Sequence, residues 1–211
     1  MINNVSRKIA EVLCDYVERT KEVDYVRYGI EIFIRGFIKL ITIVLVAYAF
    51  GVFLPMMVVV VTFSFFRFLT GGHHYSTYIR CLFVGLFVML SLAFISTKLA
   101  NFVNSATVNL ALLCSVLFGF YLSQKFAPSN HFYKKLTDHH KFILKRLSLL
   151  AIMIWGILVY LLNLNSVSID LILASIFGFL LQIISIHPYS YVFVNKIENL
   201  LERRDFFEKN S

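Results

Sequence analysis

The sequence predicts an all-α integral membrane protein with six transmembrane helices and an N-terminal amphipathic helix at the membrane interface. Hydrophobic residues make up 59% of the 211-residue chain, whereas soluble domains are closer to half apolar. The mean hydropathy is +0.76. Six apolar runs each approach the roughly 20 residues that a helix needs to cross the hydrocarbon core. Together these observations predict a chain that lies mostly within the bilayer.

Residues 1–30 precede the first apolar run and predict an amphipathic helix on the inner surface of the membrane. Apolar side chains recur there at helical spacing, with charged side chains on the opposite face. They are Val5, Ile9, Val12, Leu13, Tyr16 and Val17. A helix packed on the cytoplasmic loops would explain the same pattern. The many charges and the lack of an apolar stretch lead us to expect no cleaved secretory signal.

Residues 31–190 form the predicted membrane domain, and residues 191–211 form a cytoplasmic tail. A very short turn around Gly51 and Pro55 joins the first two apolar runs, and a polar segment, 163–170, joins the last two. Both pairs are therefore predicted to be helical hairpins. The predicted spans cover about 34–51, 53–69, 81–97, 106–124, 147–164 and 168–187.

The distribution of Lys and Arg predicts the orientation of these spans. Of the 20 basic residues, all except Lys98 fall in segments that the predicted topology places on one side. These segments are residues 1–39, the loop between spans two and three, the loop 125–146 and the tail. Basic loops stay in the cytoplasm. We therefore expect both termini in the cytoplasm, where thiols remain reduced. The same rule explains the net charge of +8 without nucleic-acid binding.

The segment 67–81, which reads RFLTGGHHYSTYIRC, is the strongest candidate for a functional site. Charged and imidazole side chains are costly near a bilayer and mark functional positions there. A thiol, an imidazole base and cations are the parts of a cysteine nucleophile. Cys81 opens the third span directly after Arg80, where a cation and the helix N-terminus favour a thiolate. His74 is the candidate base.

The spacing between His74 and Cys81 requires a bend in the chain. On one straight helix the two residues would lie about 10 Å apart along the axis. We therefore expect Gly71 and Gly72 to turn the chain so that His74 folds over Cys81. A cavity that excludes water is expected beside this segment, with walls formed by Phe65, Phe66, Phe68 and Tyr78.

Two other interpretations of this segment remain open. Cys81 could be a small packing residue and the histidines interfacial side chains. A zinc site could combine His73, His74 and Cys81 with an imidazole of the next cytoplasmic loop, which holds His131, His139 and His140. No Asp or Glu lies between residues 32 and 137, so this site would have no nearby carboxylate base. We predict no metal and no cofactor.

The core Gly71-Gly72-His73-His74 followed by Arg80-Cys81 resembles the accessory gene regulator protein B (AgrB) family. Arg67 precedes this core, and Ala127-Pro128 with the basic pair Lys134-Lys135 follows it. The resemblance covers nearly the whole chain and implies a membrane cysteine endopeptidase that processes a quorum-sensing peptide precursor. By position, His74 matches the catalytic histidine and Cys81 the nucleophile. Arg67 and Gly72 match the arginine and glycine of the family pattern, and His73 fills a variable position.

The resemblance also implies the reaction and the partners. Cys81 would form a thioester with the precursor, and a cysteine of the precursor would then close a thiolactone ring. The precursor would carry an amphipathic leader and an acidic tail, which suits the basic side chains of Lys134 and Lys135. A homodimer in the cell membrane of a Gram-positive bacterium is implied as well. One departure from the family is the lack of a serine soon after Cys81, since the first is Ser91.

A membrane peptide exporter is the main rival function, and a non-catalytic scaffold is a second. Transport usually requires polar or charged groups near the midplane of the membrane. The apolar runs hold few such groups, which favours chemistry at the membrane surface. Three polar side chains in or near these runs are predicted to form hydrogen bonds between helices. They are Ser91, Asn163 and Gln182.

Overall fold

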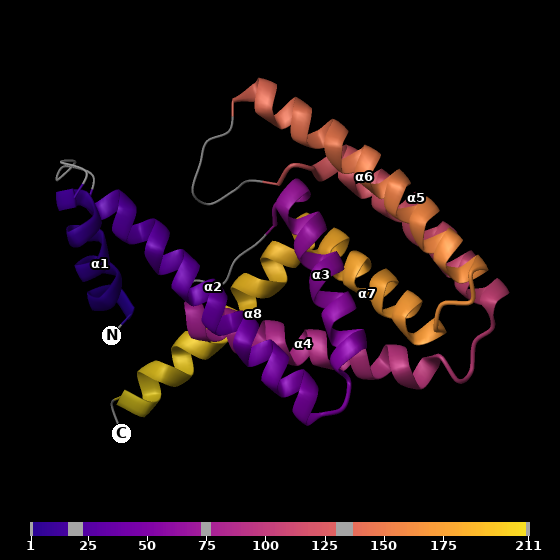
Figure 1. Ribbon diagram of the computed structural model, residues 1–211, viewed down its shortest axis with the longest axis horizontal. Coiled ribbons are helices and arrows are strands. Elements are labelled where there is room, and N and C mark those ends of the chain that lie inside the picture. Colours follow the sequence, from indigo (N-terminus) through magenta and orange to yellow (C-terminus); the bar gives the residue numbers. More distant parts are fainter. Residues whose placement is uncertain (1, 17–22, 73–76, 130–136, 210–211) are drawn as a thin grey trace. The chain divides into compact units, whose positions relative to one another are not determined.

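The computed structural model describes residues 2–16, 23–72, 77–129 and 137–209, which form helices and contain no strand. The all-α prediction is confirmed for this part of the chain. The chain divides after Phe50 into two compact units, which are treated separately (Figure 1). The helices are α1 (Ile2–Tyr16), α2 (Val23–Ala49), α3 (Phe53–Thr70), α4 (Tyr78–Leu99), α5 (Ser105–Phe126), α6 (Asp138–Leu164), α7 (Ile169–Ser185) and α8 (Pro188–Lys209).

The predicted apolar runs correspond one to one with helices α2 to α7. Four described helices, α3 to α6, are long and apolar enough to cross a membrane. A fifth span is added if α7 and α8, which meet at a bend of 84°, are counted as one broken span. The protein is therefore a multi-pass membrane protein. The full set of six spans and the side of the termini remain predictions.

In the first unit, α1 packs on α2 through a face of small side chains. Ser6, Ala10 and Cys14 are buried and recur every fourth residue, so they share one face of α1. The larger apolar side chains of α1 are exposed instead, namely Val5, Ile9, Val12, Leu13 and Tyr16. The apolar stripe expected to lie on the membrane is thus not used in packing against α2. Its contact with lipid stays a prediction.

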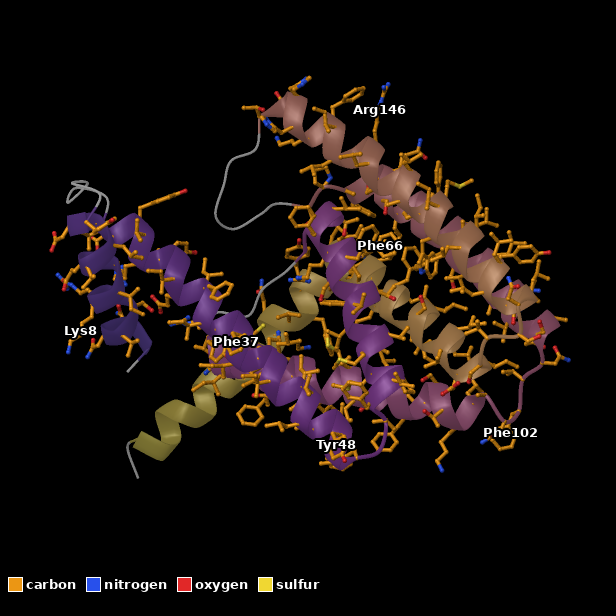
Figure 2. All side chains as sticks on the ribbon, in the orientation of Figure 1. Lys8, Phe37, Tyr48, Phe66, Phe102 and Arg146 are labelled. Carbon is orange, nitrogen blue, oxygen red and sulfur yellow. The ribbon has the colours of Figure 1, made fainter. Side chains whose placement is uncertain are left out.

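In the second unit, α7 is the central helix and contacts α3, α4, α5, α6 and α8. An aromatic cluster lies where these helices meet. Trp155 of α6 stacks on Phe179 of α7 with ring centroids 4.2 Å apart, and Phe66 of α3 meets Phe179 edge-on at 4.7 Å. All three rings are buried, and Phe66 marks this interior in Figure 2. Burial of three large rings makes this cluster the main apolar core of the unit.

Hydrogen bonds join the loops at each end of this unit. At one end, Asn163 of α6 donates to the Ser105 hydroxyl and to the Asn109 side-chain oxygen of α5, both at 2.7 Å. At the other end, the Ser129 N–H donates to the Thr70 carbonyl oxygen at 2.9 Å. The end of α3 and the segment after α5 therefore lie together, and a hydrogen bond between the Ser129 and Tyr191 hydroxyls brings the start of α8 to the same place. These are segments that the Lys and Arg pattern assigns to one side of the membrane.

The predicted loop 125–146 is shorter than expected. Helix α6 begins at Asp138, nine residues before the predicted span, because the Thr137 side chain accepts a hydrogen bond from the His140 N–H and caps the helix. Residues 138–146 are therefore the first turns of α6. Of the basic side chains expected in that loop, Lys141, Lys145 and Arg146 lie on this helix.

Candidate active site

The sharp change of direction after α3 is built on two glycines. Gly71 and Gly72 have φ angles of 73° and 141°, which L side chains rarely adopt. Helix α3 ends at Thr70, and α4 does not begin until Tyr78. The predicted break in the helix is thus confirmed at Gly71 and Gly72. The predicted base His74 and its neighbour His73 lie outside the described residues, so the expected dyad stays a prediction.

Cys81 lies in the first turn of α4 and is half-buried. Its N–H donates to the Thr77 carbonyl oxygen at 3.1 Å, so this amide is already engaged within the helix. The Thr77 side chain forms no cap on the turn. The partial positive charge of a helix N-terminus therefore lies close to the thiol. Arg80 is half-buried in the same turn.

Arg67, on the last turn of α3, is a second cation of this site besides Arg80. Its guanidinium lies within electrostatic range of Cys81 and of Tyr191 on α8. The two predicted site residues Arg67 and Cys81 are thus brought together from different helices. The guanidinium lies 5.4 Å from the centre of the Phe63 ring, and its Nη1 donates to Gln182 Oε1 at 3.4 Å. Neutral groups therefore hold this cation in place at the end of α3.

Gln182 of α7 connects the two halves of this site. Its side chain is fully buried. Nε2 donates to the Gly71 carbonyl oxygen at 2.6 Å and to Thr70 Oγ1 at 2.8 Å. Oε1 accepts from Arg67 and, at 3.2 Å, from the Ser185 hydroxyl. The predicted hydrogen bonding of Gln182 between helices is confirmed, as it is for Asn163, whereas the hydroxyl of Ser91 bonds to the Phe87 carbonyl of its own helix.

A helical pattern in the sequence of α7 marks this face. Polar and small residues recur at intervals of three, four and three in an otherwise apolar run, namely Ser175, Gly178, Gln182 and Ser185. Such spacing places them on one side of a helix. That side faces α3, because Ser175 bonds to Thr62 and Gln182 to Thr70.

Gly72 has a steric role besides its backbone conformation. A Cβ at this position would lie 2.8 Å from Nη1 of Arg67 and 3.0 Å from the Ser185 hydroxyl. Any larger side chain would displace the guanidinium from its place. The glycine expected from the sequence to bend the chain therefore also makes room for the supporting site residue Arg67.

Helix α8 contributes a group that the sequence did not suggest. The hydroxyl of Tyr191 shares a hydrogen bond with the hydroxyl of Ser129. Ser129 in turn donates its N–H to the carbonyl of Thr70, the last residue of α3. The start of α8 and the segment after α5 therefore close around the end of α3.

The aromatic cavity expected beside Cys81 lies elsewhere. A cavity of about 710 Å³ lies between α3, α6 and α7, and Phe65, Phe66 and Phe68 are among its lining residues. Tyr78 and Cys81 do not line it. The expectation was wrong because these three Phe side chains face α6 and α7 rather than the start of α4. The cavity is almost wholly apolar, so it is not the place of the thiol chemistry.

The other predicted binding residues and possible metal ligands do not form a cluster among the described residues. Lys134, Lys135 and His131 lie outside the described residues. His139 and His140 are adjacent at the start of α6, with ring centroids 6.2 Å apart. Among the described residues no group of three His, Cys, Asp or Glu side chains is arranged to hold a metal ion. Cys14, Cys81 and Cys114 are free thiols.

A family model described as accessory gene regulator B matches residues 6–186 of the chain. The match includes the whole segment from Arg67 to Cys81 as well as Gln182 and Ser185. No curated protein and no solved structure matches the chain.

Proposed function

The chain belongs to the accessory gene regulator B family, whose members act in the processing of quorum-sensing peptides, and from this premise we propose that it is a membrane cysteine endopeptidase. Cys81 is the nucleophile and His74 is the general base. The observation that supports this assignment most directly is that Cys81 lies within electrostatic range of the Arg67 guanidinium. It joins a thiol at a helix N-terminus to a guanidinium, beside a glycine turn that leads to His74.

In the first step, His74 removes the proton from the Cys81 thiol, and the sulfur attacks a carbonyl carbon near the C-terminus of the peptide precursor. The tetrahedral intermediate collapses as the C–N bond breaks. The departing amine takes the proton from His74. The N-terminal part of the precursor remains on Cys81 as a thioester, and the C-terminal part leaves as a free peptide.

In the second step, the thiol of a cysteine within the bound precursor attacks this thioester. The new carbon–sulfur bond closes a thiolactone ring, and the proton of that thiol returns to Cys81. One thioester replaces another, so this step is close to isoenergetic. The first step is uphill, because an amide becomes a thioester, and removal of the released tail drives it forward. Water must be kept from the acyl-enzyme, since hydrolysis would give a linear product.

Arg67 supplies positive charge where negative charge develops. A guanidinium near the sulfur favours the attacking thiolate, as cations do at reactive cysteines. Its fixed position also allows it to stabilise the oxyanion of the tetrahedral intermediate in a site of low dielectric constant. Hydrogen bonding to Gln182 and contact with the Phe63 ring keep the guanidinium in place before the substrate arrives.

The substrate in this proposal is a pheromone precursor with an amphipathic leader and an acidic tail. The basic side chains near the site attract such a tail over long range. We place the site at the cytoplasmic face because 19 of the 20 Lys and Arg residues belong to segments of one predicted side. Lys134 and Lys135 belong to the proposed binding surface, and a homodimer is the proposed assembly.

Cleavage of a precursor peptide by the full-length protein in lipid vesicles tests this function. The wild-type protein should release the acidic tail, whereas Cys81→Ala and His74→Ala should release none. Cys114→Ala is the control, because Cys114 is an exposed thiol on α5 and has no part in the reaction. In protein that retains both His74 and Cys81, mass spectrometry should find the N-terminal part of the precursor attached to Cys81. Cleavage by Cys81→Ala at the wild-type rate would sink the proposal, and translocation of uncut precursor would favour the exporter.

A further inference from the structure

We propose that Gln182 is a positioning residue for the reaction at Cys81, holding both the guanidinium of Arg67 and the backbone carbonyl of Gly71 at the end of α3. This inference rests on the proposed peptidase function. Gln182 lies on α7, 101 positions after the nucleophile in the sequence. It does not touch the reacting atoms, and it acts through Arg67 and Gly71.

Every hydrogen-bonding group of the Gln182 side chain is used. The amide offers two donors and an oxygen with two acceptor sites. Both donors serve the end of α3, at the Gly71 carbonyl and the Thr70 hydroxyl. The oxygen accepts from Arg67 and from Ser185. A fully satisfied buried network of this kind rigidifies its members and fixes a single arrangement.

The two sides of this amide reach two different parts of the proposed machinery. On one side, Nε2 holds the carbonyl of Gly71, the residue from which the chain leaves α3 toward His74. On the other side, Oε1 holds the guanidinium that interacts with Cys81. One side chain therefore fixes the origin of the base segment and the direction of the cation together. Catalytic geometry of this kind is lost when a supporting group shifts by about 1 Å.

Close packing of α7 on α3 explains how the Gln182 side chain can contact the end of α3. Gly178 lies one turn before Gln182, and its missing side chain lets the backbone of Val59 approach. The close approach brings the two helices together along the face that carries Gln182. The Thr70 hydroxyl donates its proton to the Phe66 carbonyl oxygen. Its oxygen is therefore free to accept a hydrogen bond from Nε2 of Gln182.

Two substitutions separate positioning from simple packing. Gln182→Met keeps the volume but removes every hydrogen bond of the amide. Gln182→Glu keeps an acceptor for Arg67 and Ser185 but removes both donors to α3. The introduced carboxylate also competes with the sulfur of Cys81 for the guanidinium. The matched control is Asn163→Leu, because Asn163 is also a nearly buried amide that joins two helices, at the opposite end of the unit.

The experiment uses the full-length protein in vesicles and measures three quantities. They are the kcat and KM of precursor cleavage, the rate of Cys81 alkylation by iodoacetamide as a function of pH, and the thermal midpoint of unfolding. Alkylation is measured with Cys14→Ser and Cys114→Ser in the background, so that only Cys81 reacts.

We expect Gln182→Met to lower kcat on the order of 10- to 100-fold, with KM changed by less than about twofold because the substrate-binding surface is untouched. Gln182→Glu should move the alkylation profile of Cys81 to higher pH, since its carboxylate draws the guanidinium away from the sulfur. Asn163→Leu should leave kcat and the alkylation profile near those of the wild type at a comparable loss of thermal stability.

Wild-type kcat in folded Gln182→Met would overturn the inference, and so would an equal loss of kcat in Asn163→Leu. An unchanged alkylation profile in Gln182→Glu would show that the amide does not act on the cation. These outcomes differ from failure of the peptidase function itself. That failure would be seen as cleavage by Cys81→Ala, while the alkylation measurements need no cleavage and would still report on Gln182.

Discussion

The backbone of Val59 on α3 passes so close to Gly178 on α7 that a Cβ on this glycine would lie 2.6 Å from the Val59 carbonyl oxygen. The nearest atoms all belong to the backbone, so no side-chain rotation can relieve the contact. The helix that carries Arg67 and the helix that carries Gln182 are therefore in direct backbone contact. Gln182 follows one turn later on the same face of α7.

Gly178→Ala should push α3 and α7 apart and thereby loosen the site. We expect a loss of unfolding free energy of about 1–3 kcal/mol, as for an overpacked core, together with a clear loss of precursor cleavage. Gly36→Ala on α2 is the control, because no atom lies within 4 Å of a Cβ there and alanine favours a helix. Thermal unfolding and a cleavage assay measure both effects. Equal stability of Gly178→Ala and the wild type would contradict the close contact.

Gly72→Ala should abolish most of the activity through the displacement of Arg67. The new methyl group would meet the guanidinium at 2.8 Å, and the φ angle of 141° adds backbone strain of about 1–3 kcal/mol. Gly51→Ala isolates the strain, since Gly51 also has a positive φ of 68° but nothing within 4 Å. Cleavage rate and thermal midpoint are measured for both variants. If Gly51→Ala and Gly72→Ala lose the same activity, contact with Arg67 has no role.

Arg67→Gln should slow precursor cleavage on the order of 100-fold or more, because one charged donor to a developing oxyanion is removed. Arg67→Lys should recover only part of this loss, since an ammonium lacks the planar fork that Gln182 and the Phe63 ring hold. The alkylation rate of Cys81 at neutral pH should fall in the same order. Arg146→Gln is the matched control, because Arg146 is exposed on α6 and stacks on Phe142. An Arg67→Gln protein with wild-type rates would remove this arginine from the mechanism.

Ser175→Ala should reduce stability while leaving the chemistry intact. The Ser175 hydroxyl accepts from the indole N–H of Trp155 at 3.0 Å and also pairs with Thr62. Its loss leaves a buried donor unsatisfied, at a cost of about 1–3 kcal/mol. Ser91→Ala serves as the comparison, because the Ser91 hydroxyl bonds only within its own helix turn at Phe87. The thermal midpoint should fall for Ser175→Ala alone. A large fall in kcat for Ser175→Ala would mean that this part of α7 also belongs to the site.

Thiol labelling in intact cells tests the proposed orientation. A charged maleimide outside the cell should not modify Cys81 until the membrane is permeabilised. Cys114 lies in the middle of α5 with its side chain exposed, so it should react only with a reagent that dissolves in the lipid. Labelling of Cys81 by the charged reagent in intact cells would place the site on the outer face.

The helices were predictable because apolar runs of this length have few alternatives in a membrane. Local chemistry likewise predicted the break at Gly71 and Gly72, since two adjacent glycines between apolar runs interrupt a helix. The hydropathy pattern predicts the start of α6 too late, because residues 138–146 are charged like a loop although the Thr137 cap begins a helix there.

Contacts between distant segments were harder to foresee. The pairing of Cys81 with Arg67 crosses two helices, and Tyr191 enters from a helix that bends away by 84°. The direction in which Phe65 and Phe68 point depends on how α3 is rotated, which the apolar sequence around them does not specify. The sequence indicates that Gln182 forms hydrogen bonds between helices. Its local sequence does not predict that Gly71 is the partner.

The central position of α7 has a consequence for biogenesis. Ribosomes deliver α3 to α6 to the membrane before the helix on which they all pack has been made. These earlier helices must therefore remain in the bilayer without the helix against which they pack. Arg67 lacks its hydrogen bond to Gln182 until α7 has been made. A chain that stops before Ile169 carries the nucleophile and the glycine turn but lacks the helix that orders them. The proposed activity is therefore expected only after α7 has been made.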